Sequence, residues 1–198
     1  MKVTIYVEGG GESKYQHIQC RKGFRKHLEK SGFSGKMPSI SACGGRNAAF
    51  DDFKTATKSK LPTDYPILLV DSEDPIAENI TSWNHLRTRD GWIPPNGVSD
   101  EQAQLMVTCM ETWIMADRVV LREVFGAPLQ ENALLSEVNL EQYGRHQVQL
   151  ALEHATRNCD RKAYKKGKRS FRSEEHRLNS SHSSISYAVF CLDRKSVV

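Results

Sequence analysis

Short apolar runs alternate with longer amphipathic segments along most of the chain. The apolar runs are rich in β-branched residues and end at glycine or polar residues, which is typical of buried strands. The predicted strands are 2–7, 37–43, 66–70 and 104–109. Between them, apolar residues recur at helical intervals among Lys and Arg. The predicted helices are 12–31, 47–58, 111–125 and 140–158, and a short helix followed by an irregular loop is expected within 76–96.

The first predicted helices each carry one apolar stripe. In the first helix the residues at helical spacing are Tyr15, Ile18, Phe24 and Leu28. In the second the expected packing residues are Ala48, Ala49, Phe53 and Ala56. A helix with one apolar stripe packs that stripe on a sheet and leaves its polar side to solvent.

Strands that alternate with helices at this length indicate right-handed βαβ units. The predicted fold is therefore α/β: a mainly parallel sheet of about four strands with helices on both faces, followed by a C-terminal helical segment. A chain of 198 residues fits one such domain.

The amino-acid composition excludes few classes of protein. The net charge of +4 comes from scattered Lys and Arg, so it mildly favours a polyanionic partner. The five cysteines are odd in number and include no CxxC pair, which indicates reduced thiols rather than disulfides or a zinc ribbon. There is no signal-peptide pattern and no apolar stretch long enough to span a bilayer. We therefore expect a cytoplasmic protein with no membrane role.

Acidic residues follow three of the predicted strands. Glu8 follows the first strand, Asp71, Glu73 and Asp74 follow the third, and Glu111 follows the fourth. Ligands of parallel α/β sheets bind beyond the carboxyl ends of the strands. Two carboxylates about 4 Å apart repel by roughly 4 kcal/mol at an effective dielectric constant near 20. A divalent cation such as Mg²⁺ or Mn²⁺ would offset this repulsion, and Mg²⁺ prefers oxygen ligands.

Each acidic position also has a purely structural interpretation. Glu8 with three following glycines is compatible with a tight turn, and Glu12 suits the start of a helix through the helix dipole. The segment 71–74 before Pro75 is compatible with a capping turn. Glu111 fits an ordinary polar helical face.

Basic residues at two places are candidate contacts for nucleic acid. Arg46 follows two glycines at the start of a helix, where a side chain can point at a phosphate. The segment 161–169 is strongly basic and includes Tyr164, which suits a nucleic-acid backbone. The candidate nucleic-acid-binding residues are Arg46, Lys165, Lys166 and Lys168. The alternative for the basic run is a solvated surface segment.

The acidic pattern resembles a known family. A strand that ends in Glu-Gly, followed by a strand that ends in Asp-x-Asp, is the Toprim pattern of topoisomerases, primases and overcoming-lysogenization-defect nucleases. The chain is also similar, over nearly all of 1–171, to the bacterial domain-of-unknown-function family 4276. That likeness rests on Val7-Glu8-Gly9, Val70-Asp71, the segment 110–117 and the segment 164–167.

The resemblance implies roles for the acidic residues. By this resemblance, Glu8 would act as general acid or base, and Asp71 and Glu73 would hold Mg²⁺ or Mn²⁺. Two residues are added as candidates by their positions and not by the resemblance: Glu12 for catalysis and Glu111, after the fourth strand, as a metal ligand. Glu73 stands where the Toprim pattern usually has Asp, which affects the geometry expected of a two-metal site.

The resemblance also implies a function. The expected activity is metal-dependent phosphoryl transfer, most simply cleavage of DNA or RNA, beside an ABC-type ATPase in bacterial anti-phage defence. Two alternatives remain open at this point: a non-catalytic module that binds an ATPase or a nucleotide, and a small-molecule phosphatase.

The last part of the chain resembles something other than a protein domain. Residues 172–198 match, in order, the translation of short-read sequencing adapters. We therefore expect a Toprim-like domain over 1–171, truncated at its C-terminus, and a non-native disordered tail over 172–198. A Ser-rich disordered C-terminus is the alternative.

Overall fold

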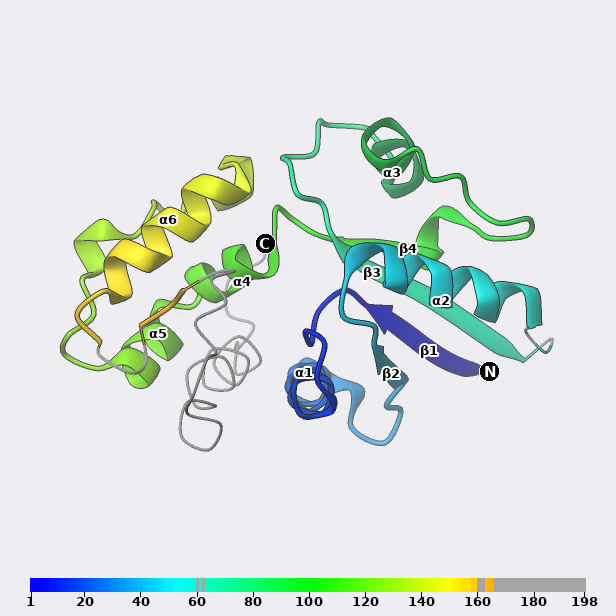
Figure 1. The fold of residues 1–198 in the computed structure, drawn as a ribbon, viewed down its shortest axis with the longest axis horizontal. Coiled ribbons are helices and arrows are strands. Elements are labelled where there is room, and N and C mark those ends of the chain that lie inside the picture. Colours follow the sequence, from blue (N-terminus) through cyan, green and yellow to red (C-terminus); the bar gives the residue numbers. More distant parts are fainter. Residues whose placement is uncertain (60, 62, 160–162, 166–198) are drawn as a thin grey trace.

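The part of the chain up to Met106 is built around a four-stranded sheet in which all strands are parallel (Figure 1). The computed structural model describes residues 1–59, 61, 63–159 and 163–165. The strands are β1 (Lys2–Val7), β2 (Ser39–Ala42), β3 (Asp64–Asp71) and β4 (Ala103–Met106), in the spatial order β2-β1-β3-β4. The predicted α/β class and its parallel sheet are confirmed.

The register of the two central strands brings their carboxyl ends level. In the β1–β3 pair, Lys2 lies opposite Asp64 and Val7 opposite Leu69. The backbone N–H of Glu8 continues this pairing by donating to the carbonyl of Leu69 at 2.9 Å. The residues that follow β1 and β3 therefore meet at one edge of the sheet.

Helices cover both faces of the sheet, as the alternating pattern predicts. They are α1 (Lys14–Leu28, continued by a π-helical turn over Glu29–Phe33), α2 (Arg46–Ser59) and α3 (Ser82–Asp90). One face packs α2 and α3 in a core that contains Phe53, Leu68 and Trp83. The other face packs α1 and the later helices in a core that contains Phe24 and Met106.

The later helices lie beyond the carboxyl ends of the strands, opposite the end of the sheet where the chain begins (Figure 1). They are α4 (Met110–Ala116), α5 (Arg118–Phe125) and α6 (Arg145–Thr156), with 3₁₀ turns over Glu131–Ala133 and Leu140–Gln142. Another 3₁₀ turn, Asp100–Gln102, directly precedes β4. The single helix predicted over 111–125 is thus two helices. Asp117 separates them, because its carboxylate accepts the backbone N–H of Val120 at 2.9 Å and caps α5.

Several predicted boundaries differ by a few residues. The second and fourth strands are shorter than the apolar runs that predict them, and α6 begins at Arg145 rather than at residue 140. In α1, Cys20, Gly23 and Phe24 are buried, whereas Tyr15 and Ile18 are 43% and 40% exposed. In the described part of the chain, no helix has the length and apolar character needed to cross a membrane.

Candidate metal centre

Glu8 is positioned by two glycine turns that pair with each other. Gly9 donates its N–H to the carbonyl of Gly44 at 2.8 Å, and Gly44 donates back to Gly9 at 2.9 Å. Gly44 has a φ of 78°, and a Cβ there would lie 2.7 Å from the carbonyl oxygen of Gly11. A side chain at Gly44 would therefore disrupt the pairing that holds the backbone beside Glu8.

Asp71 is the last residue of β3, and its side chain points toward the start of α4. Its Oδ1 accepts the backbone N–H of Met110, the first residue of α4, at 2.9 Å. Its own N–H donates to Oε2 of Glu8 at 3.1 Å. One oxygen of each carboxylate is thus oriented by a backbone N–H group.

Glu73 reaches the same place through an unusual backbone conformation. Its φ of 69° lies in the left-handed region, which a residue with a side chain seldom adopts. Two hydrogen bonds maintain it, because Ser72 donates to the carbonyl of Met106 at 2.9 Å and Glu73 donates to that of Thr108 at 2.7 Å. These bonds prolong the pairing of β3 with the chain after β4.

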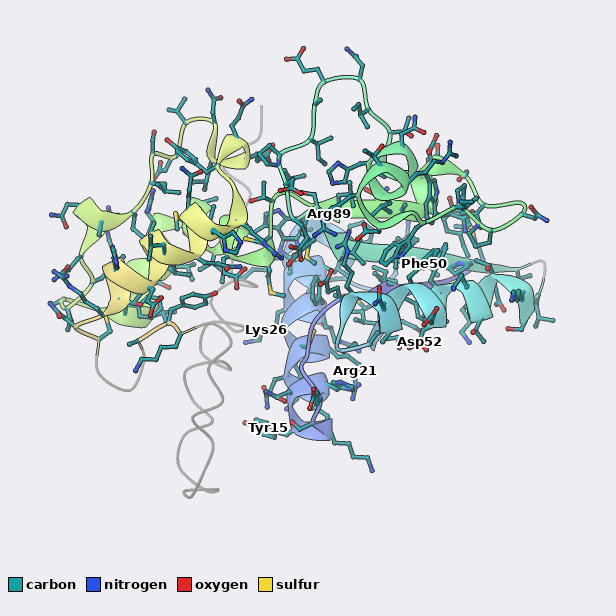
Figure 2. The ribbon with its side chains drawn as sticks, turned by 45° about the horizontal axis from the view of Figure 1, so that its top comes forward. Tyr15, Arg21, Lys26, Phe50, Asp52 and Arg89 are labelled. Carbon is teal, nitrogen blue, oxygen red and sulfur yellow. The ribbon has the colours of Figure 1, made fainter. Side chains whose placement is uncertain are left out.

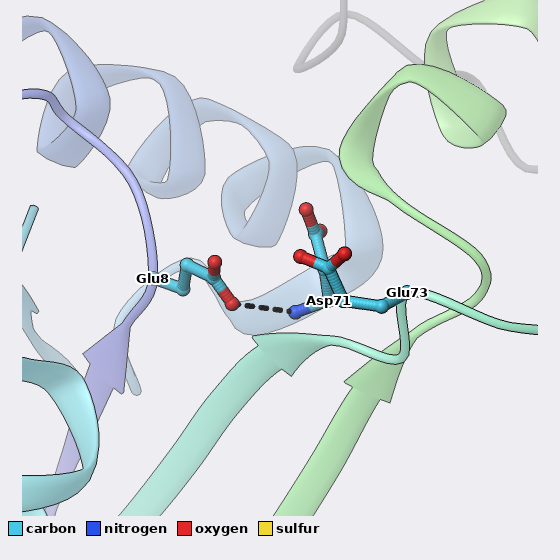
Figure 3. A group of neighbouring side chains, drawn as sticks. All are labelled: Glu8, Asp71 and Glu73. Carbon is cyan, nitrogen blue, oxygen red and sulfur yellow. Dashed lines mark hydrogen bonds between the residues drawn. The ribbon is translucent and has the colours of Figure 1, made fainter. Parts of the chain in front are cut away.

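Together the three residues form one acidic cluster, Glu8, Asp71 and Glu73 (Figure 3). A carboxylate oxygen from each lies within 4.8 Å of the others. Asp71 and Glu73 are buried, with 8% and 9% of their surface exposed, and Glu8 is half-buried. At 4.8 Å, two such charges repel by about 3 kcal/mol if the effective dielectric constant is near 20.

Arg46 offsets part of this charge from the first turn of α2. Its Nη1 donates to Oε2 of Glu8 at 3.1 Å and to the carbonyl of Asp71 at 2.5 Å. Its Nε and Nη2 bind both oxygens of Asp90 at 3.0 and 2.7 Å, and its guanidinium lies 5.0 Å from the ring centre of Trp92. Burial acts to raise the pKa of Asp90, but the hydrogen bonds and charge of Arg46 outweigh it and hold that pKa below the usual value.

Two further arginines pair with Glu73. Nη2 of Arg89, near the end of α3, lies 3.3 Å from Oε2 of Glu73, and Arg145, the first residue of α6, pairs with the same oxygen. Arg89 also pairs with Asp74 and Asp90. Among the described residues, Arg46, Arg89 and Arg145 therefore pair with the carboxylates of Glu8, Glu73, Asp74 and Asp90. The carboxylate of Asp71 is the fifth acidic group at this place. Three positive charges offset only part of five negative ones.

The donor atoms of the cluster suit a hard divalent cation. All three donors are carboxylate oxygens on two neighbouring strand ends, which matches the preference of Mg²⁺ and Mn²⁺ for oxygen. The remaining negative charge favours a cation, and the backbone N–H groups on Glu8 and Asp71 fix their orientation. A buried cluster of this kind could hold a metal ion.

Glu111, a predicted metal ligand, faces a different partner. It is 8% exposed, and its Oε1 accepts the phenolic O–H of Tyr164 at 2.6 Å. Burial and the nearby Glu111 charge raise the pKa of Tyr164 well above its ordinary value. Glu111 does not belong to the cluster of Glu8, Asp71 and Glu73, so its role as a ligand stays a prediction.

The other predicted site residues differ in where the structure places them. Glu12 is exposed in the turn before α1 and does not belong to the cluster, so its catalytic role stays a prediction. Arg46 lies at the cluster, where it pairs with carboxylates. Lys165 is exposed, and Lys166 and Lys168 lie outside the residues that the structure describes.

Sequence reasoning did not identify Arg89, Asp90 and Arg145. Arg89 and Asp90 are the last two residues of α3, and Arg145 is the first residue of α6. All three are separated in the sequence from the acidic residues at the strand ends. Only the folded arrangement brings them to Glu73 and Arg46, and no local motif marks them. Trp92, beneath Arg46, belongs to the irregular loop and carries no local signal of this role either.

Comparison with family models, with curated proteins and with solved structures gives no match to this chain.

Proposed function

We propose that this protein is a Toprim-like, divalent-metal-dependent phosphoryl-transfer protein that cleaves DNA or RNA. One observation carries the proposal: carboxylate oxygens of Glu8, Asp71 and Glu73 lie within 4.8 Å of one another beyond the ends of adjacent parallel strands. The confirmed α/β fold and the buried acidic cluster are compatible with the Toprim resemblance.

The residues divide the chemistry among them. Asp71 and Glu73 would hold Mg²⁺ or Mn²⁺, which when bound polarises a phosphoryl oxygen and lowers the pKa of a bound water. Glu8 Oε2 is held by Arg46 and by the N–H of Asp71, while its Oε1 has no hydrogen bond to any described residue. In this proposal, Glu8 Oε1 takes a proton from the attacking water.

The arginines that pair with Glu73 are suited to a phosphate. The side chains of Arg89 and Arg145 are 26% and 36% exposed, so both can turn from Glu73 to a phosphodiester at the same edge. Arg forms paired hydrogen bonds with phosphate oxygens, which would orient the scissile group.

The resemblance also supports a protein partner. We include in the proposal an ABC-type ATPase that works with this protein in anti-phage defence. Activity tests therefore need arms with and without an ABC-type ATPase, taken from the neighbouring genes where one is found.

Cleavage assays test the proposal. Plasmid DNA, RNA and nucleotides are incubated with the protein in Mg²⁺ or Mn²⁺, with and without that ATPase. We expect cleavage of a polynucleotide that requires the metal and is lost in Asp71→Asn, because the amide keeps an acceptor for Met110 but loses the charge. Asp100→Asn, at an exposed position before β4, is the matched control and should cleave normally. Cleavage that survives Asp71→Asn contradicts the proposal.

The arginine pairs favour one second candidate, a non-catalytic module that binds a nucleotide or an ATPase. Arg46, Arg89 and Arg145 offset part of the acidic charge as a structural ion-pair network would. In that case the assays would show binding without cleavage under every condition, and Asp71→Asn would leave the affinity for metal unchanged.

A further inference from the structure

The outer side of α1 carries an unusual concentration of positive charge. Its 15 residues include no Asp or Glu. They include five exposed cations, which are Lys14, Arg21, Lys22, Arg25 and Lys26. Figure 2 shows Tyr15, Arg21 and Lys26 projecting from this helix. We call these five cations the α1 stripe.

Helical spacing distributes the α1 stripe over an arc of about 140° of the helix surface. Lys14, Arg21 and Arg25 are separated by seven and four residues, which puts them in one row, and Lys22 and Lys26 form the adjacent row. The opposite side, with Cys20 and Phe24, is buried in the core. The cations therefore form a continuous charged surface rather than a ring around the helix.

Ion pairs account for little of the charge on four of the five cations in the α1 stripe. Lys14, Arg21 and Lys22 form no ion pair with a described residue, and Arg25 makes an exposed pair with Glu29 that contributes little. On two other helices, cations do have acidic neighbours: Lys54 pairs with Asp51 on α2, and Arg122 on α5 pairs with Glu131. The composition of α1 is thus different from that of the other helices.

The length of the α1 stripe matches the charge spacing of a nucleic-acid backbone. The twelve residue-to-residue steps from Lys14 to Lys26 span about 18 Å along a helix axis. One strand of B-form DNA presents a phosphate about every 3.4 Å of its axis, so roughly five phosphates face this length. Five cations over that span are complementary to such a strand.

The α1 stripe also connects to the acidic cluster through the chain. The glycine turn that follows Glu8 packs on α1, because His17 Nε2 lies 2.8 Å from the carbonyl oxygen of Gly11 and a Cβ on Gly10 would lie 3.2 Å from Cys20. Figure 3 shows α1 passing behind the three carboxylates. A polyanion bound along α1 therefore lies on the element that directly supports Glu8.

We propose that the α1 stripe binds the sugar–phosphate backbone of a nucleic acid. This inference rests on the proposed function and sharpens it, because it assigns the surface that binds the polynucleotide. A lipid surface fits less well, because the apolar side of α1 is already buried and cannot enter a bilayer. Exposed Tyr15, beside Lys14, adds a ring on which a base can stack.

Salt-dependent binding tests the inference. The affinity of the full chain for a labelled DNA duplex two helical turns long is measured by fluorescence anisotropy in EDTA, from roughly 50 to 200 mM salt. The triple variant Lys14→Gln, Arg21→Gln, Lys22→Gln should reduce the slope of log K against log salt by about 2 to 3. Glutamine keeps a high helix propensity, so α1 should stay folded.

A second triple variant controls for net charge. Lys2→Gln, Lys58→Gln, Arg157→Gln removes the same number of exposed cations from β1, from the end of α2 and from the residue after α6. We expect its slope to change by less than about 1. Equal slopes for the two variants, or α1-dependent binding to anionic lipid vesicles in place of DNA, would overturn the inference.

A titration with Mn²⁺ separates this inference from the proposed function. The α1 triple variant should bind Mn²⁺ as the unmodified chain does, because none of its residues belongs to the acidic cluster. If the unmodified chain fails to bind Mn²⁺ yet shows the α1-dependent slope, the proposed function fails and the binding surface stands. If it binds Mn²⁺ and the two slopes are equal, the metal site stands and the α1 inference fails.

Discussion

Glu73 has an energetically unfavourable backbone conformation, and its side chain completes the acidic cluster. Its φ of 69° is left-handed, a conformation that costs a residue with a Cβ about 1 kcal/mol or more relative to glycine. Residues in such conformations concentrate at functional sites, where the surrounding structure maintains them. At Glu73 the surrounding structure consists of the backbone bonds to Met106 and Thr108.

This cost predicts an order of stability for two variants that both remove the carboxylate. Glu73→Gly should be more stable than Glu73→Ala by about 1 kcal/mol, because glycine adopts the left-handed conformation without a Cβ clash. Urea unfolding measures the difference. The same pair at Glu123, an exposed position inside α5, is the control and should show the opposite order. Equal stability of the two Glu73 variants would contradict the assigned conformation.

The sequence predicts part of the site at the level of single residues. Glu8 and Asp71 directly follow apolar strands, and parallel pairing brings such positions together, so local pattern is sufficient to find them. Glu73 was predicted as a site residue from the same acidic segment, 71–74. The sequence does not predict its left-handed backbone conformation. Arg89 and Arg145 carry no pattern, because they meet Glu73 only through the packing of α3 and α6.

Among the elements, the break between α4 and α5 shows where a periodic pattern is insufficient. Apolar spacing continues through 111–125, which favours one long helix. Asp117 stops it, because an Asp side chain can bind backbone N–H groups and begin a new helix instead. Periodicity identifies the buried residues well but not the position at which the helix axis changes.

The cap at Asp117 gives an element-scale prediction. Asp117→Ala should lower the free energy of unfolding by about 1 kcal/mol, because the N–H of Val120 loses its acceptor. Asp117→Asn keeps an acceptor and should cost less. Chemical denaturation of both variants checks the difference, and equal losses would show that the cap contributes nothing.

At the scale of the whole molecule, the alternation of strands and helices was enough to predict the class of fold. The preference for right-handed crossovers and short connections restricts the possible strand orders of the sheet. The observed order, β2-β1-β3-β4, is compatible with this preference. The α4–α6 helices could be predicted as elements but not placed. Their core residues include Met115 and Leu152. Apolar residues of this kind indicate that a helix packs on something, but they do not indicate which part of the molecule it packs on.

Buried thiols make the stability of the molecule depend on pH. Burial raises the pKa of Cys20 and Cys109 to about 12 and that of Cys43 to about 11, whereas an unfolded thiol titrates near 8.5. A pKa raised by folding contributes stability that is fully present below the unfolded pKa and is lost as the pH rises toward the folded pKa. The protein should therefore lose stability from about pH 8.5 upward.

Cys20→Ala tests this dependence. Between about pH 8 and pH 10, the variant should lose about 1 to 2 kcal/mol less of its free energy of unfolding than the unmodified chain does, because one buried thiol no longer titrates. Urea unfolding at the two pH values measures both losses under reducing conditions. Equal losses would mean that Cys20 ionises as easily in the folded state as in the unfolded one.

The central claim is that Glu8, Asp71 and Glu73 hold a divalent cation, and calorimetric titration with Mn²⁺ tests it most directly. The unmodified chain should bind Mn²⁺, Asp71→Asn should bind it at least about tenfold more weakly, and the exposed Asp100→Asn should bind it normally. Binding that Asp71→Asn leaves unchanged, or no binding to the unmodified chain, would contradict the claim.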